Sequence, residues 1–367
     1  MIKVFFDHQK FTTQRYGGIS RYFSNIIDEI KTRPEDFEYQ LGILYSKNYY
    51  IKDEPQFINQ FIGRKFLDSQ FDGKVYTIND RYCRYLLKRN NFDIFHPTYY
   101  DTYFLDRLKK PFVTTIHDMT HEMLPEYFWA GDPLTINKRL SIERADKIIA
   151  ISQTTKKDLL NLSNVKEEKI DVIYHGIDTI TPLEVQVVKD LPEHFVLFVG
   201  DRSGYKNFYL MIQGFAKIHK RFPDLRMVLT GGGTMEQAEI EYIRRLNVAE
   251  KIIHIQVSDS ELNYLYQKAA LFLYPSLYEG FGLPILEAFR AQCPILLSNT
   301  ECFNEIALDA AVYFDPYSLS DLVAKLESII HNSSLRNDLI KKGNVRLLDF
   351  PLKTCNEKTL SLYQSLI

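Results

Sequence analysis

Residues 278–288 have the sequence Tyr-Glu-Gly-Phe-Gly-Leu-Pro-Ile-Leu-Glu-Ala, which predicts a turn from a strand into a helix. Glycines at 280 and 282 let the backbone approach a ligand closely or adopt a positive φ. Pro284 suits the first turn of a helix, where its missing N–H costs nothing. The amides just before Pro284 would point outward at the positive end of the helix dipole, so the turn is a candidate anion site.

Two carboxylates lie eight residues apart in this stretch. Glu279 would sit on the loop and Glu287 at the end of the first helical turn, so both could face one ligand. Two acids beside an anion-binding helix end suit a ligand with both hydroxyls and phosphate, such as a nucleotide sugar. A structural interpretation stays open, in which the glycines form a tight turn and Glu287 balances the helix dipole.

The whole stretch resembles the E-x7-E motif of retaining GT-B glycosyltransferases, in particular glycosyltransferase family 4. The resemblance implies that Glu279 binds the hydroxyls of a donor sugar and that Glu287 binds the ribose of its nucleotide. It also implies that the backbone amides of Phe281, Gly282 and Leu283 line the sugar and the diphosphate.

The composition bounds the class of protein. A length of 367 residues predicts two domains, and 45% hydrophobic with 25% charged residues is typical of a soluble globular chain. The net charge of −2 gives no overall attraction to nucleic acid, and no nucleic-acid partner is expected. Four scattered cysteines, no signal peptide and no apolar run near about 20 residues favour a cytoplasmic protein with reduced thiols.

Short apolar runs rich in Val, Ile and Phe alternate with longer amphipathic segments, which is typical of α/β folds with parallel sheets. The strands expected in the first half are Ile2–Asp7, Tyr39–Tyr45, Ile94–Pro97, Phe112–His117, Lys147–Ser152 and Ile170–Tyr174. Those expected in the second half are Phe195–Gly200, Arg226–Gly231, Ile252–Val257, Leu271–Pro275, Pro294–Ser298 and Val312–Asp315. A weakly patterned segment near 175–193 separates the two series.

The resemblance implies a GT-B fold, in which two Rossmann-like parallel-sheet domains face a central cleft. We expect an N-terminal acceptor-side domain over residues 1–178 and a C-terminal nucleotide-sugar domain over residues 179–350. Residues 351–367 are helical in pattern and would cross back to pack on the N-terminal domain. Ligands of open α/β sheets bind at the carboxyl ends of the strands.

The loop Val199–Asn207 follows the first strand of the second half and carries Arg202 and Lys206. A planar guanidinium and an ammonium four residues apart can clamp a diphosphate, although solvated loop charges are the simpler interpretation. The segment resembles the G-x-R-x-x-x-K-N loop of the family. That resemblance implies that both residues are catalytic, because they hold the pyrophosphate and stabilise the departing nucleotide.

Two further segments of the second half resemble donor-binding parts of the family. Leu229–Thr234 is similar to an L-x-G-x-G turn near the nucleotide, which implies that Gly231 lines the donor site. Val257–Leu262 is similar to a segment that contacts the base, and Val257 is the residue expected to make a backbone contact.

In the first half, Tyr16–Tyr22 resembles the glycine-rich loop that closes over the donor, which implies that Gly17 and Gly18 offer amides to its phosphate. A histidine at a strand end is more often packed than catalytic, but Thr114–Asp118 resembles the T-x-H-D segment of the family. The resemblance implies a catalytic His117 that reaches the donor sugar or a substrate oxygen. Asp118 would orient the imidazole or cap a helix.

Two more histidines lie at strand ends. His96 is a candidate for the acceptor side. His175 stands where the family's N-G-V-D segment has Asn, so no role is assigned to it.

Arg81, Arg84 and Lys88 share one face of a predicted helix, and the segment Phe57–Leu67 mixes Phe and Ile with basic residues. In related enzymes such helices dock on anionic membranes to reach lipid-linked acceptors. A peripheral position on the inner face of the plasma membrane is therefore one expectation, and a solvated helix face is the other.

Taken together, the resemblance implies a retaining, front-face hexosyltransferase that uses a UDP- or GDP-sugar and a glycan or lipid-linked glycan acceptor in surface polysaccharide synthesis of the O-antigen or capsule type. No Asp-x-Asp motif and no cluster of His or Cys ligands occurs, so neither a metal nor another cofactor is expected. Two alternatives stay open: a GT-B nucleotide-sugar epimerase, and a non-catalytic subunit that binds nucleotide sugar.

Overall fold

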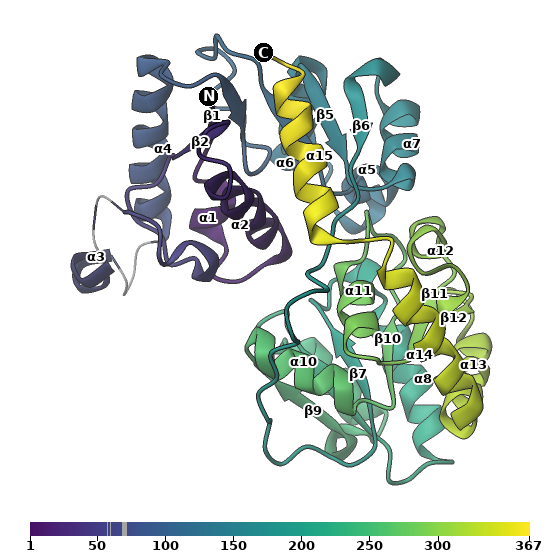
Figure 1. Cartoon of the computed structure of the whole chain (residues 1–367). Coiled ribbons are helices and arrows are strands. Elements are labelled where there is room, and N and C mark those ends of the chain that lie inside the picture. The colour runs from purple at the N-terminus through teal and green to yellow at the C-terminus, as the bar shows by residue number, and fades with distance from the viewer. Residues whose placement is uncertain (57, 59, 68–71) are drawn as a thin grey trace. The chain divides into compact units, whose positions relative to one another are not determined.

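The computed structural model describes residues 1–56, 58, 60–67 and 72–367. The chain forms two compact units (Figure 1). The first unit comprises Met1–Glu122, Trp129–His175 and Lys353–Ile367, and the second comprises Met123–Phe128 and Gly176–Leu352. The main boundary therefore falls after His175, within three residues of the position expected from the sequence.

The first unit is built on parallel strands. They are β1 (Ile2–Phe6), β2 (Phe37–Leu41), β3 (Ile94–His96), β4 (Val113–Ile116), β5 (Lys147–Ala150) and β6 (Ile170–Val172). Strands pair in the orders β2-β1-β3 and β4-β5-β6, and a single parallel bridge between Phe95 and Phe112 joins the two sets. The helices are α1 (Gln9–Thr13), α2 (Gly18–Lys31), α3 (Gln60–Leu67), α4 (Asp72–Arg89), α5 (Thr120–Met123), α6 (Pro133–Arg144), α7 (Gln153–Leu162) and α15 (Leu352–Gln364).

The C-terminal helix α15 completes the core of the first unit. Its Leu360 and Tyr363 are fully buried and belong to the same apolar cluster as Phe6 of β1 and Phe23 of α2. The yellow helix lies beside the strands of this unit in Figure 1. Residues more than 300 positions apart in the sequence therefore share one hydrophobic core.

The second unit is a six-stranded parallel sheet. Its strands are β7 (Phe195–Val199), β8 (Arg226–Thr230), β9 (Ile252–Ile255), β10 (Leu271–Tyr274), β11 (Ile295–Ser298) and β12 (Val312–Phe314). Its helices are α8 (Phe208–His219), α9 (Gln237–Arg245), α10 (Asp259–Lys268), α11 (Leu283–Arg290), α12 (Glu301–Ala307), α13 (Leu319–His331) and α14 (Ser333–Leu347). All twelve predicted strands are present, most of them a residue or two shorter than expected.

The strand order β12-β11-β10-β7-β8-β9 places a topological switch point in the second unit. From β7 the chain proceeds outward through β8 and β9, whereas from β10 it proceeds outward in the opposite direction through β11 and β12. Loops leaving adjacent strands in opposite directions open a crevice at their carboxyl ends, which is where open α/β sheets bind ligands. A ligand-binding site is therefore expected at the loops after β7 and β10.

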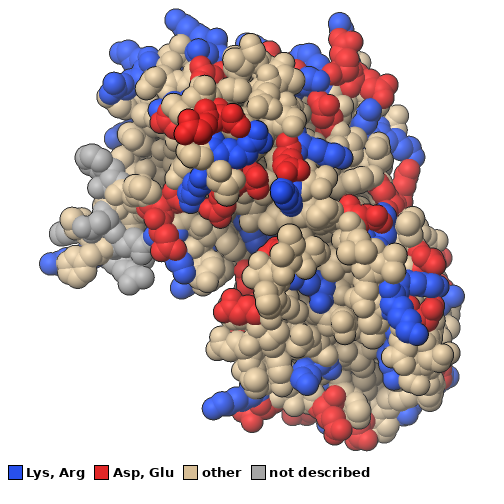
Figure 2. All heavy atoms as spheres, viewed as in Figure 1, with Lys and Arg blue, Asp and Glu red and all other residues tan. Residues whose placement is uncertain are grey.

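Charges are interspersed over the face drawn in Figure 2, with blue and red residues mixed, in keeping with the net charge of −2. On α4, Arg84 pairs with Asp80 at 2.8 Å, so one of the three cations of the predicted basic face is neutralised by an acid one turn earlier. The segment 57–67 lies partly outside the described residues. Membrane contact stays a prediction. Among the residues that the structure describes, every helix is too short or too polar to span a bilayer.

Candidate active site

The loops after β7 and β10 meet at the switch point of the second unit. The backbone N–H of Leu277 donates to the carbonyl of Tyr205 at 2.8 Å and ties the two loops together. Across this junction, Nζ of Lys206 lies 2.6 Å from Oε1 of Glu279, and the two side chains are only 11% and 14% exposed. The fold therefore joins the basic loop and the first acid of the 278–288 stretch in one ion pair.

The environment of Lys206 keeps it charged. Burial acts to lower the pKa of its ammonium, but the Glu279 carboxylate and the surrounding tyrosines hold that pKa well above its ordinary value. The Nζ atom lies 5.0 Å from the ring centroid of Tyr205 and 5.8 Å from that of Tyr274, so two aromatic faces also stabilise the cation. The loop after β7 thus presents a permanent positive charge.

A segment from the first half of the chain supports this loop. Residues 123–128 pack within the second unit, where the rings of Phe128 and Tyr205 lie 5.7 Å apart. A Cβ atom at Gly204 would come within 2.6 Å of the Tyr127 ring. Close packing by Tyr127 therefore explains why glycine precedes Tyr205 in this loop.

Arg202 is held within the protein. Its Nε donates to both carboxylate oxygens of Glu239, at 2.9 and 3.0 Å, and the two side chains are 3% and 6% exposed. Its Nη atoms donate to four successive carbonyls, those of residues 231–234, at 2.9–3.2 Å. The guanidinium thus organises the glycine turn after β8 as well as carrying charge beside the loop.

The glycine turn has a backbone that favours glycine. Gly231, Gly232 and Gly233 have φ values of +89°, +68° and +68°. A Cβ atom at Gly232 would lie 2.7 Å from the Cα of Asp201. Gly231 therefore lies against the loop that carries Arg202, and its place beside a donor stays a prediction.

The stretch 278–288 adopts the predicted strand-to-helix turn. Gly282 caps α11 with a φ of +95°, and Leu283 and Pro284 open the helix. The side chain of Phe281 is buried and packs 5.7 Å from the ring of Phe350, so only its backbone can face a ligand. Glu287 lies one turn into α11, where the hydroxyl of buried Tyr266 donates to its Oε2 at 3.4 Å.

Val257, which is predicted to contact the nucleotide base, lies at the edge of the same sheet. Val257 is half-buried just after β9, immediately before Ser258, which caps α10. The neighbouring Gln256 donates to the carbonyl of Gly233 at 3.3 Å. Val257, Gly231 and Lys206 therefore all follow the carboxyl ends of adjacent strands.

His117 lies at the end of β4 in the first unit. The pKa of its imidazole is lowered to about 3, mainly by burial; Asp118 opposes this shift, whereas the nearby Lys10 and His96 add to it. The ring stacks on His175 at 5.7 Å, and its backbone N–H donates to the Tyr100 hydroxyl at 2.9 Å. His117 is therefore neutral at pH 7, and its catalytic role stays a prediction.

Two roles were predicted for Asp118, orienting the His117 imidazole or capping a helix, and the structure shows the capping contact. Its Oδ1 accepts from the backbone N–H of Thr120 at the start of α5, at 2.9 Å. The fully buried Lys138 of α6 donates to the Asp118 carbonyl at 3.2 Å and to Glu122 at 2.8 Å. Asp118 thus fixes the loop that carries His117.

The acceptor-side hypothesis for His96 is wrong. The residue is fully buried in the first unit, with Nδ1 against the hydroxyl of Tyr363 and Nε2 2.9 Å from Oγ1 of Thr115. Burial also lowers the pKa of His96 to about 3. Both ring nitrogens are used to join β3, β4 and α15, so His96 is a packed core histidine.

Gly17 and Gly18 lie at the N-terminus of α2, with Gly17 as its N-cap. The loop opens the second helix of the chain, because the five-residue α1 precedes it. The side chain of Gln14 packs over Gly17, and its Oε1 accepts from the Ser20 amide at 3.3 Å.

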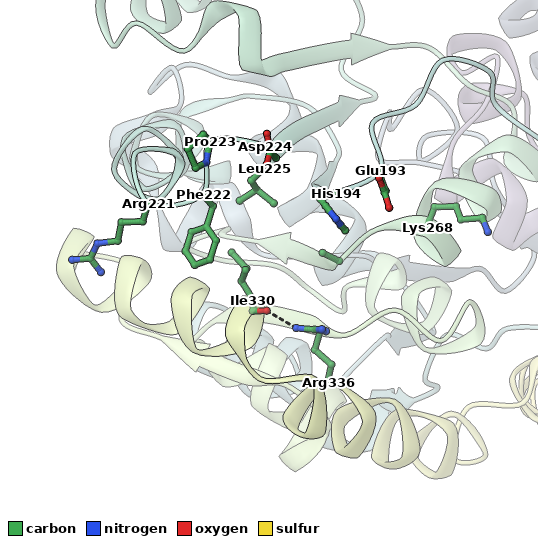
Figure 3. A pocket seen from close by; sticks show the side chains of 11 residues that line it. Glu193, His194, Arg221, Phe222, Pro223, Asp224, Leu225, Lys268, Ile330 and Arg336 are labelled. Carbon is green, nitrogen blue, oxygen red and sulfur yellow. Dashed lines mark hydrogen bonds between the residues drawn. The ribbon is translucent and has the colours of Figure 1, made fainter.

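A hollow of about 580 Å³ lies elsewhere in the second unit (Figure 3). Its lining includes Glu193 and His194 before β7, Leu225 before β8 and Ala270 before β10. It therefore opens at the amino ends of the strands, at the opposite edge from Lys206 and Glu279. Its Arg336 donates to two carbonyls at the end of α13, so that cation serves the helix terminus.

Two family descriptions divide this chain between them. "Glycosyltransferase Family 4" matches residues 16–180, and "Glycosyl transferases group 1" matches residues 181–346. The chain belongs to the group 1 glycosyltransferases. The second match spans the paired Lys206 and Glu279 and all of α11.

Curated relatives of this glycosyltransferase include two enzymes of O-antigen synthesis. The "O-antigen chain mannosyltransferase B" of Escherichia coli is 27% identical over 291 residues, 74% of each chain. The "O-antigen chain mannosyltransferase RfbU" of Salmonella typhimurium is 28% identical over 233 residues, 63% of each chain.

Solved structures confirm the GT-B fold of this glycosyltransferase. Anabaena Alr3699/HepE in complex with UDP-glucose superposes with a TM-score of 0.75 at 16% identity, covering all of both chains. WaaG, described as a glycosyltransferase involved in lipopolysaccharide biosynthesis, has a TM-score of 0.74 at 15% identity and covers 99% of each chain.

Three residues of the candidate site were not predicted from the sequence. Glu239 binds Arg202, Tyr266 binds Glu287, and Tyr274 lies over Lys206. Glu239 had a signal, since it completes a capping box with Glu236 directly after the glycine turn. The two tyrosines are buried aromatics of a helix and a strand, and nothing in their local sequence distinguishes them.

Proposed function

We propose that this glycosyltransferase moves a hexose from a UDP- or GDP-sugar to a hydroxyl of a glycan or lipid-linked glycan, with retention and without a metal, at the cytoplasmic face of the membrane. The observation that carries the proposal is the buried Lys206–Glu279 pair at the switch point of the second unit, beside the N-terminus of α11. A cation for the diphosphate and an acid for sugar hydroxyls are there side by side.

The relatives narrow the product class. Both O-antigen relatives are mannosyltransferases, which favours mannose as the hexose and a surface polysaccharide as the product. The Anabaena structural relative was crystallised with UDP-glucose, which supports a nucleotide diphosphate sugar as the donor. Calorimetry across UDP-, GDP- and dTDP-sugars identifies the base and the sugar.

The chemistry is charge stabilisation and positioning. The bond between the anomeric carbon and the diphosphate breaks while the acceptor oxygen attacks from the same face, and the leaving phosphate takes the acceptor proton. Lys206 balances the charge that develops on the diphosphate. Arg202 adds charge and holds the glycine turn, and neutral His117 offers a hydrogen bond to a sugar or substrate oxygen.

The requirement for an acceptor distinguishes a transferase from an epimerase and from a non-catalytic binding subunit. An epimerase would convert the sugar nucleotide without any acceptor, and a binding subunit would convert nothing. Release of nucleoside diphosphate that depends on added glycan acceptor supports the transferase.

The two acids should have separable effects on binding. Because Glu287 is proposed to hold the ribose, Glu287→Ala should weaken nucleoside diphosphate and intact donor alike, by about tenfold for a lost charge-assisted hydrogen bond. Glu279→Ala should weaken only the intact donor. Calorimetry with both ligands measures this, and equal loss of diphosphate affinity in the two variants would show that the roles are misassigned.

Activity should persist without divalent metal. The sequence contains no Asp-x-Asp motif, and the Lys206 ammonium stays protonated across the working pH range. Turnover after treatment with EDTA should stay within about twofold of the untreated value, because a protein cation takes the place of a metal at the diphosphate. Complete loss that Mn²⁺ or Mg²⁺ restores would contradict the proposal.

A further inference from the structure

Glu239 and Arg202 form the most enclosed ion pair of the candidate site. The Glu239 carboxylate accepts from Nε of Arg202 at 2.9 and 3.0 Å, and its Oε2 also accepts from the backbone N–H of Glu236 at 2.7 Å. Three hydrogen bonds thus fix the carboxylate at the N-terminus of α9. A carboxylate that accepts from two donors, Nε of Arg202 and the Glu236 amide, and has only 6% of its side chain exposed, holds its partner in one orientation.

The other side of the guanidinium faces the glycine turn. Its Nη atoms bind the carbonyls of residues 231–234 in succession, which leaves one Nη1 hydrogen without an acceptor among the described residues. Because Nε is anchored by Glu239, the plane of the guanidinium cannot rotate away from these carbonyls. The position of that remaining hydrogen is therefore also fixed by Glu239.

The turn itself has two sets of backbone polar groups. The carbonyls of residues 231–234 bind Arg202, and the backbone amides are the remaining polar groups of the turn. The amides of Gly232, Gly233 and Thr234 donate to no acceptor in the described part of the chain. Arg202 thus holds the carbonyls of the turn and leaves these amides available to another acceptor.

We propose that Glu239 is a positioning residue of the transfer reaction: it anchors Arg202, and Arg202 in turn orients the Gly231–Thr234 turn against the donor. The inference rests on the proposed function, since it concerns the same donor site. Glu239 itself does not contact the substrate in this proposal. Glu239 acts only through the guanidinium of Arg202.

The chain offers a matched control for this proposal. Glu236 lies on the same helix end, carries the same charge and caps the backbone N–H of Glu239, but its side chain is exposed. Glu239→Gln and Glu236→Gln therefore remove one negative charge each from the same turn of α9. Only the first change removes the carboxylate that binds Arg202.

The test compares kcat, donor KM, nucleoside diphosphate affinity and thermal midpoint for both variants. Glu239→Gln should lower kcat by about tenfold or more, whereas Glu236→Gln should stay within twofold of the wild type. In an Arg202→Met background, adding Glu239→Gln should change kcat and affinity by less than twofold, because the residue through which it acts is gone. This double variant also leaves no unpaired buried charge, so it serves if Glu239→Gln alone does not fold.

Two results would overturn the proposal. One is a Glu239→Gln variant whose kcat matches that of Glu236→Gln. The other is a full additional loss when Glu239→Gln is added to Arg202→Met, which would give Glu239 a role independent of Arg202. The affinity for nucleoside diphosphate is measured separately from hexose transfer. If no hexose acceptor is found, the proposed function is contradicted, but the affinities of Glu239→Gln and Glu236→Gln can still be compared.

Discussion

Replacement of Lys206 by alanine is expected to lower kcat by about 100-fold or more. The ammonium is a preorganised charge in a buried site, and removal of one such contact from a developing anion typically costs this much. Its raised pKa keeps the charge in place throughout the working pH range, so the loss should appear equally at pH 6 and pH 8. Steady-state assays with saturating donor and acceptor measure it.

The control is Lys268→Ala, which removes an exposed lysine from α10 of the same unit and should leave kcat within twofold of the wild type. Lys206→Arg keeps the charge but changes its shape, and partial activity in that variant would separate charge from geometry. Near-normal turnover in Lys206→Ala would remove Lys206 from the mechanism.

Replacement of Arg202 by alanine should damage both turnover and stability. The loss of its charge and of the ordered glycine turn should lower kcat by about 100-fold. Loss of one partner of a buried ion pair also leaves Glu239 uncompensated, which costs roughly 3–5 kcal/mol. For a unit of this size, that corresponds to a fall in Tm of about 10 °C, measurable by scanning calorimetry.

Arg245→Ala provides the comparison, because Arg245 is an exposed residue in the last turn of α9. Its loss should change Tm by no more than about 1–2 °C, as expected for a surface charge near a helix end. An Arg202→Ala protein that melts like this control would show that the contacts with Glu239 and the turn contribute little to stability.

The fold could be predicted from the sequence because its signals are local. Apolar runs mark the strands of both units, and Gly282 with Pro284 marks the start of α11 within a residue. The expected strand at 39–45 lies at Phe37–Leu41 instead, because its register is set by residue-by-residue pairing with β1. Pairing partners are distant in the sequence, so local patterns locate a strand better than its ends.

Only those residues of the candidate site that belong to recognisable sequence motifs could be predicted. Lys206 and Glu279 lie 73 residues apart, and the fold brings them to 2.6 Å. The partner of Arg202 could not be found in the same way, since Glu239 is ordinary in its own helix and becomes distinctive only through tertiary contact. His96 was misinterpreted for the same reason, because burial by α15 is invisible in the segment around β3.

The place of α15 in the core of the first unit has a consequence for synthesis on the ribosome. Residues 176–352 supply nearly all of the second unit, so it can fold while translation continues. The first unit lacks Leu360 and Tyr363 until α15 has been made, although its first strand is translated more than 350 residues earlier. At about 5–20 residues per second, the N-terminal sheet waits tens of seconds for the helix that closes its core. The half of the enzyme that is made first is therefore the half that is finished last.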